Sequence, residues 1–215
     1  MSENSQAKAA ILERIRGAAP AAAAHREQQY AAIPRGYIRS GKLSEEQKLE
    51  LLEDRLREYD AGVYRTSAEE LPQTIAKILS ERKMHRVGLA RETPSSWLPE
   101  GFAFQLVEKA PAVDLDRLDG VLTGCTVAIA ETGSIVLQNA AAQGPRQLSL
   151  VPDYHCCIVF AKQVVETVPE SFDRLGATSS LPTTFISGPS ATADIEMTRI
   201  KGVHGPRFLD IVLVI

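Results

Sequence analysis

Three short segments of this chain carry most of the side chains that could do chemistry. The first is AETGS at 130–134, where an acidic residue follows an apolar run and precedes two hydroxyl residues. The second is GPSATADIE at 188–196, which joins a glycine turn to hydroxyl and acidic side chains, and the third is GVHGPR at 202–207. The candidate residues are Glu131, Thr132, Gly133, Ser134, Gly188, Ser190, Thr192, Asp194, Glu196, His204 and Gly205.

In AETGS, Glu131 lies at the end of an apolar run of strand length. A carboxylate is costly there unless it is solvated, paired or functional. A functional Glu131 would act as a base or a nucleophile, with hydroxyl and backbone donors in the residues that follow it. The alternative is an ordinary surface turn, because Thr-Gly-Ser is common loop chemistry.

In GPSATADIE, Gly188 follows a predicted strand, at the place where ligands bind outside the carboxyl ends of strands in a doubly wound sheet. Ser190 and Thr192 could donate hydroxyls to a phosphate or carboxylate. Asp194 and Glu196 could orient a sugar hydroxyl, bind a cation or act as a base. The alternative is structural: a hydroxyl caps a helical turn over 190–196, and the acids stabilise its first turn.

The histidines and cysteines give weaker indications. His204 on a tight turn could be a general acid or base, although such a residue more often packs and hydrogen-bonds locally. Cys156 and Cys157 follow His155 in a predicted strand, where successive side chains face opposite ways, so we interpret all three as packing residues. The four histidines are scattered and lack ligand spacing, so we predict no metal site.

The elements that must position these residues change in type along the chain. Helical periodicity predicts helices over 7–18, after Ser44, and over 69–83. Short apolar runs then predict strands, two of them close enough to form a hairpin. The predicted strands are 85–90, 102–107, 125–130, 135–139, 154–165, 183–187 and 208–215.

The last strand indicates the fold class. Residues 208–215 are apolar at every position except Asp210, which is typical of a strand covered on both faces. We therefore predict an α/β fold, a three-layer α/β/α sandwich with a mixed, mostly parallel sheet. Residues 1–60 would form an N-terminal helical extension and residues 61–215 the α/β domain.

Composition limits the partners. The 24 basic and 27 acidic residues nearly cancel, so the chain has no global attraction to nucleic acid or to anionic membranes. No window approaches the ~20 apolar residues that a membrane helix requires. Nothing at the start resembles a signal peptide, and three cysteines form no disulfide framework, so we expect a cytoplasmic protein.

Four segments in this order resemble the LutC/YkgG family of lactate utilization proteins, which carry the LUD domain: IAETGSIVL, LSLVPDYHCCIVF, ISGPSATADIE and KGVHGPRFLDIVLV. The resemblance runs from about Val63 to the C-terminus. It implies a fold similar to the NagB/RpiA/CoA-transferase group. It also implies a pocket in which the turn at 131–134 faces residues 188–196, with His204 and Gly205 nearby.

The same resemblance implies a role in oxidising L-lactate to pyruvate alongside two iron–sulfur proteins, LutA-like and LutB-like. Three cysteines at unsuitable spacing cannot hold a cluster that needs four thiolates, so we expect this chain alone to bind no cofactor and the clusters to lie in the partners. The alanine-rich N-terminal helix could pack against a second copy and form a homo-oligomer.

Three functions of different class remain open at this point. The first is an accessory subunit of a lactate-oxidising assembly that binds a small anionic ligand or a partner surface. The second, by analogy with the fold, is a stand-alone enzyme on a nucleotide, CoA thioester or sugar phosphate, with Glu131 as nucleophile or base. The third is a fold that is kept only as an interaction module.

Overall fold

The computed structural model describes residues 3–18, 23–108, 110–193, 199–202 and 204–215. The chain divides into two compact units, Met1–Tyr37 and Ile38–Ile215. The first contains helices α1 (Glu3–Ala18) and α2 (Ala23–Ala31). Helix α1 covers the helix predicted over 7–18 and exposes Ile11, Leu12 and Ile15.

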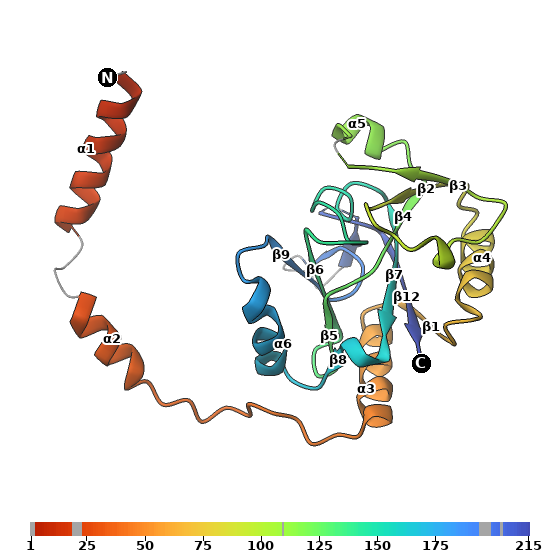
Figure 1. Cartoon of the computed structure of the whole chain (residues 1–215), viewed down its shortest axis with the longest axis horizontal. Coiled ribbons are helices and arrows are strands. Elements are labelled where there is room, and N and C mark those ends of the chain that lie inside the picture. Colours follow the sequence, from red (N-terminus) through yellow and green to blue (C-terminus); the bar gives the residue numbers. More distant parts are fainter. Residues whose placement is uncertain (1–2, 19–22, 109, 194–198, 203) are drawn as a thin grey trace. The chain divides into compact units, whose positions relative to one another are not determined.

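The second unit is built on a six-stranded sheet in which every neighbouring pair is parallel (Figure 1). Strand β12 lies between β1 and β7, and its residues after Phe208 are buried, as the apolar run predicted. In spatial order the strands are β1 (Gly62–Thr66), β12 (Phe208–Val214), β7 (Tyr154–Phe160), β4 (Gly120–Thr123), β2 (Arg86–Leu89) and β3 (Ala103–Leu106).

A second sheet of four strands follows the order β8 (Val164–Val165), β5 (Val127–Ile129), β6 (Ser134–Gln138) and β9 (Thr183–Ile186). Strands β5 and β6 form the predicted antiparallel hairpin. One core cluster joins this sheet to the six-stranded sheet, through residues such as Ile135 and Ile211. The second sheet therefore packs on one face of the parallel sheet.

The segment after Gly188 differs from the helical turn that was predicted over 190–196. Ala191–Ala193 forms strand β10, antiparallel to β11 (Arg199–Lys201). The backbone N–H of Ser190 donates to Pro206 O at 2.8 Å, and Gly202 N–H donates to Ser190 O at 2.9 Å. These long-range bonds hold the backbone extended, whereas the prediction considered only local capping.

Helices cover both sheets. Helix α4 (Leu71–Glu81) packs on one face of the six-stranded sheet, and α6 (Val168–Leu175) packs on the second sheet. The unit also contains the short helix α5 (Ala112–Leu115) and 3₁₀ turns at Ser95–Trp97, Ala161–Gln163 and Gly176–Thr178. The three-layer α/β/α prediction is confirmed, with the second sheet as an addition.

Helix α3 (Glu45–Glu58) belongs to the second unit, although the sequence placed it in an extension ending at residue 60. Ser44 caps it in a capping box with Gln47. Its buried face, Leu49, Leu52 and Leu56, packs into the core between the sheets. Each such leucine contributes about 2 kcal/mol by burial, which explains why α3 is part of this unit.

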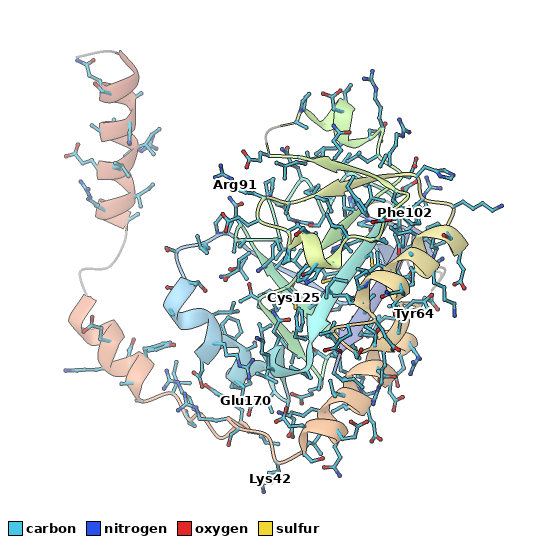
Figure 2. The ribbon with its side chains drawn as sticks, turned by 45° about the vertical axis from the view of Figure 1, so that its right-hand side comes forward. Lys42, Tyr64, Arg91, Phe102, Cys125 and Glu170 are labelled. Atoms are coloured by element: carbon cyan, nitrogen blue, oxygen red, sulfur yellow. The ribbon has the colours of Figure 1, made fainter. Side chains whose placement is uncertain are left out.

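The arm before α3 is tied to α6. Gly41 N–H donates to Glu170 Oε1 at 3.0 Å, and Leu43 N–H donates to Glu166 Oε2 at 2.7 Å. Figure 2 shows Glu170 beside the arm that carries Lys42. Burial opposes the shift, but backbone N–H groups of Thr167, Gly41 and Glu166 that donate to Glu170 hold its pKa below the usual value. The arm is therefore held against the start of α6 just before α3 begins.

Candidate functional site

A cleft of about 250 Å³ lies where the turn after β9 and the turn at 204–206 meet the first residues of β7 and β12. Gly188, Ser190, His204 and Gly205, all predicted as site residues, line it. The other lining residues are Arg146, Ser149, His155, Phe185, Ile186, Ser187, Pro189, Pro206 and Leu209.

The cleft differs in position from the one expected. Gly188 does follow the carboxyl end of a strand, but that strand is β9 of the second sheet. His155 and Leu209 are the second residues of β7 and β12, so the cleft lies at the amino ends of parallel strands. The ligand site was expected at the carboxyl ends of the parallel strands. The cleft lies at their amino ends instead, because the second sheet supplies one of its walls.

Ser190 connects the two turns that form this wall. Its N–H donates to Pro206 O, and its Oγ accepts from the His204 N–H at 3.2 Å. The His204 side chain is exposed at the rim. The predicted proximity of GPSATADIE and GVHGPR is thus a result of direct backbone and hydroxyl bonds.

The AETGS turn reaches the cleft only through its last residue. Ser134 Oγ lies 2.6 Å from Ser187 Oγ, and Thr132 Oγ1 donates to Ser134 Oγ at 2.8 Å. Glu131 is exposed and is not among the cleft residues. The turns at 131–134 and 187–190 therefore meet, but Glu131 is not part of the cleft lining.

Two glycines of these motifs are explained by packing. Gly133 has φ +60° and Gly188 has φ +86°, a region that favours glycine. A Cβ at Gly133 would lie 2.7 Å from Arg55 Cβ, and one at Gly188 would lie 2.6 Å from Tyr59 Cβ. Both turns therefore press against the carboxyl end of α3, and close packing accounts for both glycines without a ligand.

The remaining predicted residues give less information. Thr192 lies in β10, while Asp194 and Glu196 lie outside the described residues. Their contribution to the cleft stays a prediction.

His155 is a cleft residue that the sequence analysis interpreted only as packing. The side chain is fully buried, its Nε2 lies 2.7 Å from Thr123 Oγ1, and its Nδ1 has no hydrogen-bond partner among the described atoms. Burial, together with the positive charge of Arg146, lowers the pKa of His155 to about 4. A signal was present: a histidine inside an otherwise apolar strand requires a polar partner.

Arg146 is the second cleft residue that was missed. It is exposed, and its Nη1 lies 3.5 Å from the buried Ser149 Oγ. In the part of the chain that the structure describes, no carboxylate pairs with this guanidinium. No local pattern marks Arg146, because it lies in a connecting segment whose distance to His155 depends on the fold.

The opposite face of the same strands contains a closed polar cluster. Buried Asp210 accepts two hydrogen bonds from Arg82, from Nε at 2.9 Å and from Nη2 at 2.7 Å, and one from the Tyr154 hydroxyl at 3.0 Å. This pairing raises the pKa of Arg82, and burial raises that of Tyr154. Every polar group here has a partner, which indicates a structural role.

Within the described ranges, no group of three or more His, Cys, Asp or Glu side chains could hold a metal ion. Over the same ranges, no helix combines the length and apolar character needed to span a bilayer. Cys125, Cys156 and Cys157 are free and buried, and Figure 2 places Cys125 in the interior.

The chain is similar to known proteins. The LUD domain matches residues 106–214. Lactate utilization protein C of Deinococcus radiodurans is 45% identical over 176 residues, 80% of this chain and 82% of that protein. Lactate utilization protein C of Halalkalibacterium halodurans is 30% identical over 185 residues, covering 76% of this chain and 77% of that protein.

A solved structure agrees with these matches. The crystal structure of a DUF162 family protein from Deinococcus radiodurans has a TM-score of 0.70 and 39% identity, covering 80% of this chain and 99% of that one. The matched regions include the cleft segments after residue 106. The fold, the ordered motifs and these similarities together show that the chain belongs to the LUD domain family.

Proposed function

We propose that this chain is a component of a lactate utilization system and acts as an accessory subunit in the oxidation of L-lactate to pyruvate. The observation that carries the proposal is its similarity to lactate utilization protein C, at 45% identity over most of both chains. In this proposal the electrons pass to iron–sulfur partner proteins, LutA-like and LutB-like. Three free, buried thiols suit a reducing compartment, which supports a cytoplasmic location.

The cleft is our candidate for this subunit's contribution. It combines one exposed guanidinium, three serine hydroxyls and a buried imidazole, all of which can bind or orient a small anion. Removing hydrogen from L-lactate releases two protons and two electrons. The described cleft side chains can hold a carboxylate and position a proton, and the partners would accept the electrons.

The test is growth of a host on L-lactate as the carbon source. Deleting this chain, in a strain without a redundant system, should abolish that growth, and the wild-type chain should restore it. The tagged chain should also co-purify with iron–sulfur proteins from lactate-grown cells. Normal growth after deletion would contradict the proposal.

The geometry gives less support to a stand-alone enzyme that uses Glu131 as nucleophile. That carboxylate is exposed and lies outside the cleft lining. The hydroxyl of Ser134, in the same turn, contacts the cleft residue Ser187. A thermal-stability screen with phosphate-bearing ligands examines this alternative directly.

A further inference from the structure

Strand β9 is an edge of the second sheet. In the described part of that sheet it pairs with β6 on one side only. In an antiparallel pair, alternate residues point their backbone N–H and C=O groups away from the partner strand. Along the outer edge of β9 these groups can pair with an added strand, which is one way in which domains bind an extended peptide.

A groove runs beside this edge. The cleft is lined by residues 185–187, and a narrow hollow of about 20 Å³ is lined by Pro182 and Thr184. Arg146 and Ser149 line both hollows, so the two adjoin, and we call them together the edge groove. Residues from both faces of β9 contribute, as expected for a groove that follows the edge of a strand.

The two faces of β9 present different chemistry to this groove. Ile186 packs against the core cluster between the sheets, so its neighbour Phe185 points to the opposite face. There the ring centroid of Phe185 lies 5.9 Å from that of Phe172, and both rings are about half exposed. Thr184, on the same face as Ile186, lines the narrow hollow together with Arg146. An added strand would therefore meet an exposed guanidinium on one face and an apolar surface on the other.

The charge of the groove limits the added strand. In the described part of the chain, no carboxylate pairs with Arg146, which lines both hollows. A guanidinium matches a carboxylate by two parallel hydrogen bonds, so the complementary segment carries an acidic side chain at this point. Because successive side chains of a strand alternate between faces, the residues on either side of that acid would lie on the face of Phe185.

We propose that the edge groove binds an extended segment of a partner protein, which adds to β9 as a strand and carries an acidic residue between two apolar ones. The acidic side chain pairs with Arg146, and the apolar side chains pack on Phe185 and Phe172. This inference deepens the proposed function, because it gives the accessory subunit a surface for a partner. It rests on that function only for the partner's identity.

The experiment adds the blocked peptide acetyl-Thr-Val-Glu-Val-Thr-amide to the full chain and follows hydrogen exchange of the backbone amides of 183–187 by NMR. The amides that point outward should exchange at least about tenfold more slowly when the peptide is bound, because the added strand protects them. No protection at any peptide concentration up to the solubility limit would overturn the proposal.

Two other occupants of the edge give different results. Equal protection by propionate would assign the groove to a small carboxylate and overturn the proposal. Protection that appears without peptide and rises with protein concentration would assign the edge to a second copy of the chain, and would also overturn it.

Altered peptides separate the two features of the segment. A peptide with glutamine in place of glutamate should bind about threefold more weakly, because it lacks the charge that pairs with Arg146. The glutamate peptide N-methylated at every residue has no backbone donors and should give no protection. Full protection by the N-methylated peptide would reject strand addition.

A matched pair of variants assigns the charge preference. Arg146→Gln should bind the glutamate and glutamine peptides equally, whereas Arg117→Gln, an exposed cation outside the edge groove, should keep the difference. A difference that persists in Arg146→Gln, or that is lost in both variants, would overturn the pairing with Arg146.

The outcomes separate this inference from the proposed function. Loss of growth on L-lactate after deletion, combined with no protection of β9 by the peptide, would retain the proposed function and reject the edge groove. Protection of β9 combined with normal growth would retain the edge groove and reject the function.

Discussion

Tyr154 and His155 are neighbours at the start of β7, yet they point to opposite faces of the parallel sheet and lie in different environments. The Tyr154 hydroxyl bonds Asp210, whose carboxylate also accepts two bonds from Arg82. His155 has one partner, Thr123, and its buried Nδ1 has none among the described atoms.

This difference in hydrogen-bond partners distinguishes polar groups that stabilise the fold from polar groups that could bind a ligand. In the Tyr154 cluster, the Asp210 carboxylate, the Tyr154 hydroxyl and the Arg82 guanidinium bond one another, so this cluster needs no partner from outside the chain. On the His155 face, one buried nitrogen and one exposed guanidinium lack full partners among the described residues. Substitutions on the first face should therefore change stability most, and those on the second should change binding most.

The largest expected effect comes from breaking the closed cluster. Asp210→Ala should lower the free energy of unfolding by about 4 kcal/mol, because Arg82 and Tyr154 lose their buried partner. Chemical denaturation measures this. Asp153→Ala, which removes an exposed pair with Arg207, is the control and should cost less than about 1 kcal/mol. Equal losses in the two variants would contradict the structural role of the cluster.

Lowering the pH should destabilise the His155 face. The folded pKa of His155, about 4, lies below the unfolded value near 6.5, so the unfolded state binds the proton first. The stabilisation is complete above pH 6.5 and is lost as the pH falls toward 4, by about 3 kcal/mol in total. His155→Gln should lack this part of the pH dependence, and identical slopes for both proteins would refute it.

Gly188 lines the cleft and also packs against Tyr59 at the end of α3, so a substitution there tests the packing explanation for this glycine. Gly188→Ala should lower the free energy of unfolding by about 2 kcal/mol, because φ is positive and the new Cβ would contact Tyr59. Gly101→Ala has a similar φ of +88° but open space around it, and should cost only about 1 kcal/mol. A smaller loss at Gly188 than at Gly101 would reject the packing explanation.

The smallest expected stability effect is at Arg146. Arg146→Gln should change the free energy of unfolding by less than about 0.5 kcal/mol, because the side chain is exposed and has only a long contact to Ser149 among the described residues. Thermal or chemical denaturation measures it. A loss above about 1.5 kcal/mol would mean that Arg146 supports the fold.

Local patterns predicted much of the fold. The Ser44 cap and the leucine spacing located α3, and the unbroken apolar run located β12. The prediction of a helical turn after Gly188 was wrong because hydrogen bonds from residues 202–206 determine that backbone. Such bonds join distant positions, and the sequence of GPSATADIE carries no trace of them.

The candidate site was predicted less completely. Gly188, Ser190, His204 and Gly205 were predicted as site residues and line the cleft, whereas Glu131 is exposed and lies outside the lining. Arg146 could not be found, because nothing in its surrounding sequence indicates the neighbourhood of β7. His155 was interpreted as a packing residue, because a histidine in an apolar strand gives the same sequence pattern whether or not both of its ring nitrogens have partners.

The most direct test of the central claim is the ¹⁵N NMR signal of the His155 side chain, followed from pH 7 to pH 4 in the full chain. Because burial lowers the pKa of His155 to about 4, we predict that the ring is neutral at pH 7 and at pH 6 and takes up a proton only as the pH approaches 4. A ring that is already protonated at pH 6 would contradict the account.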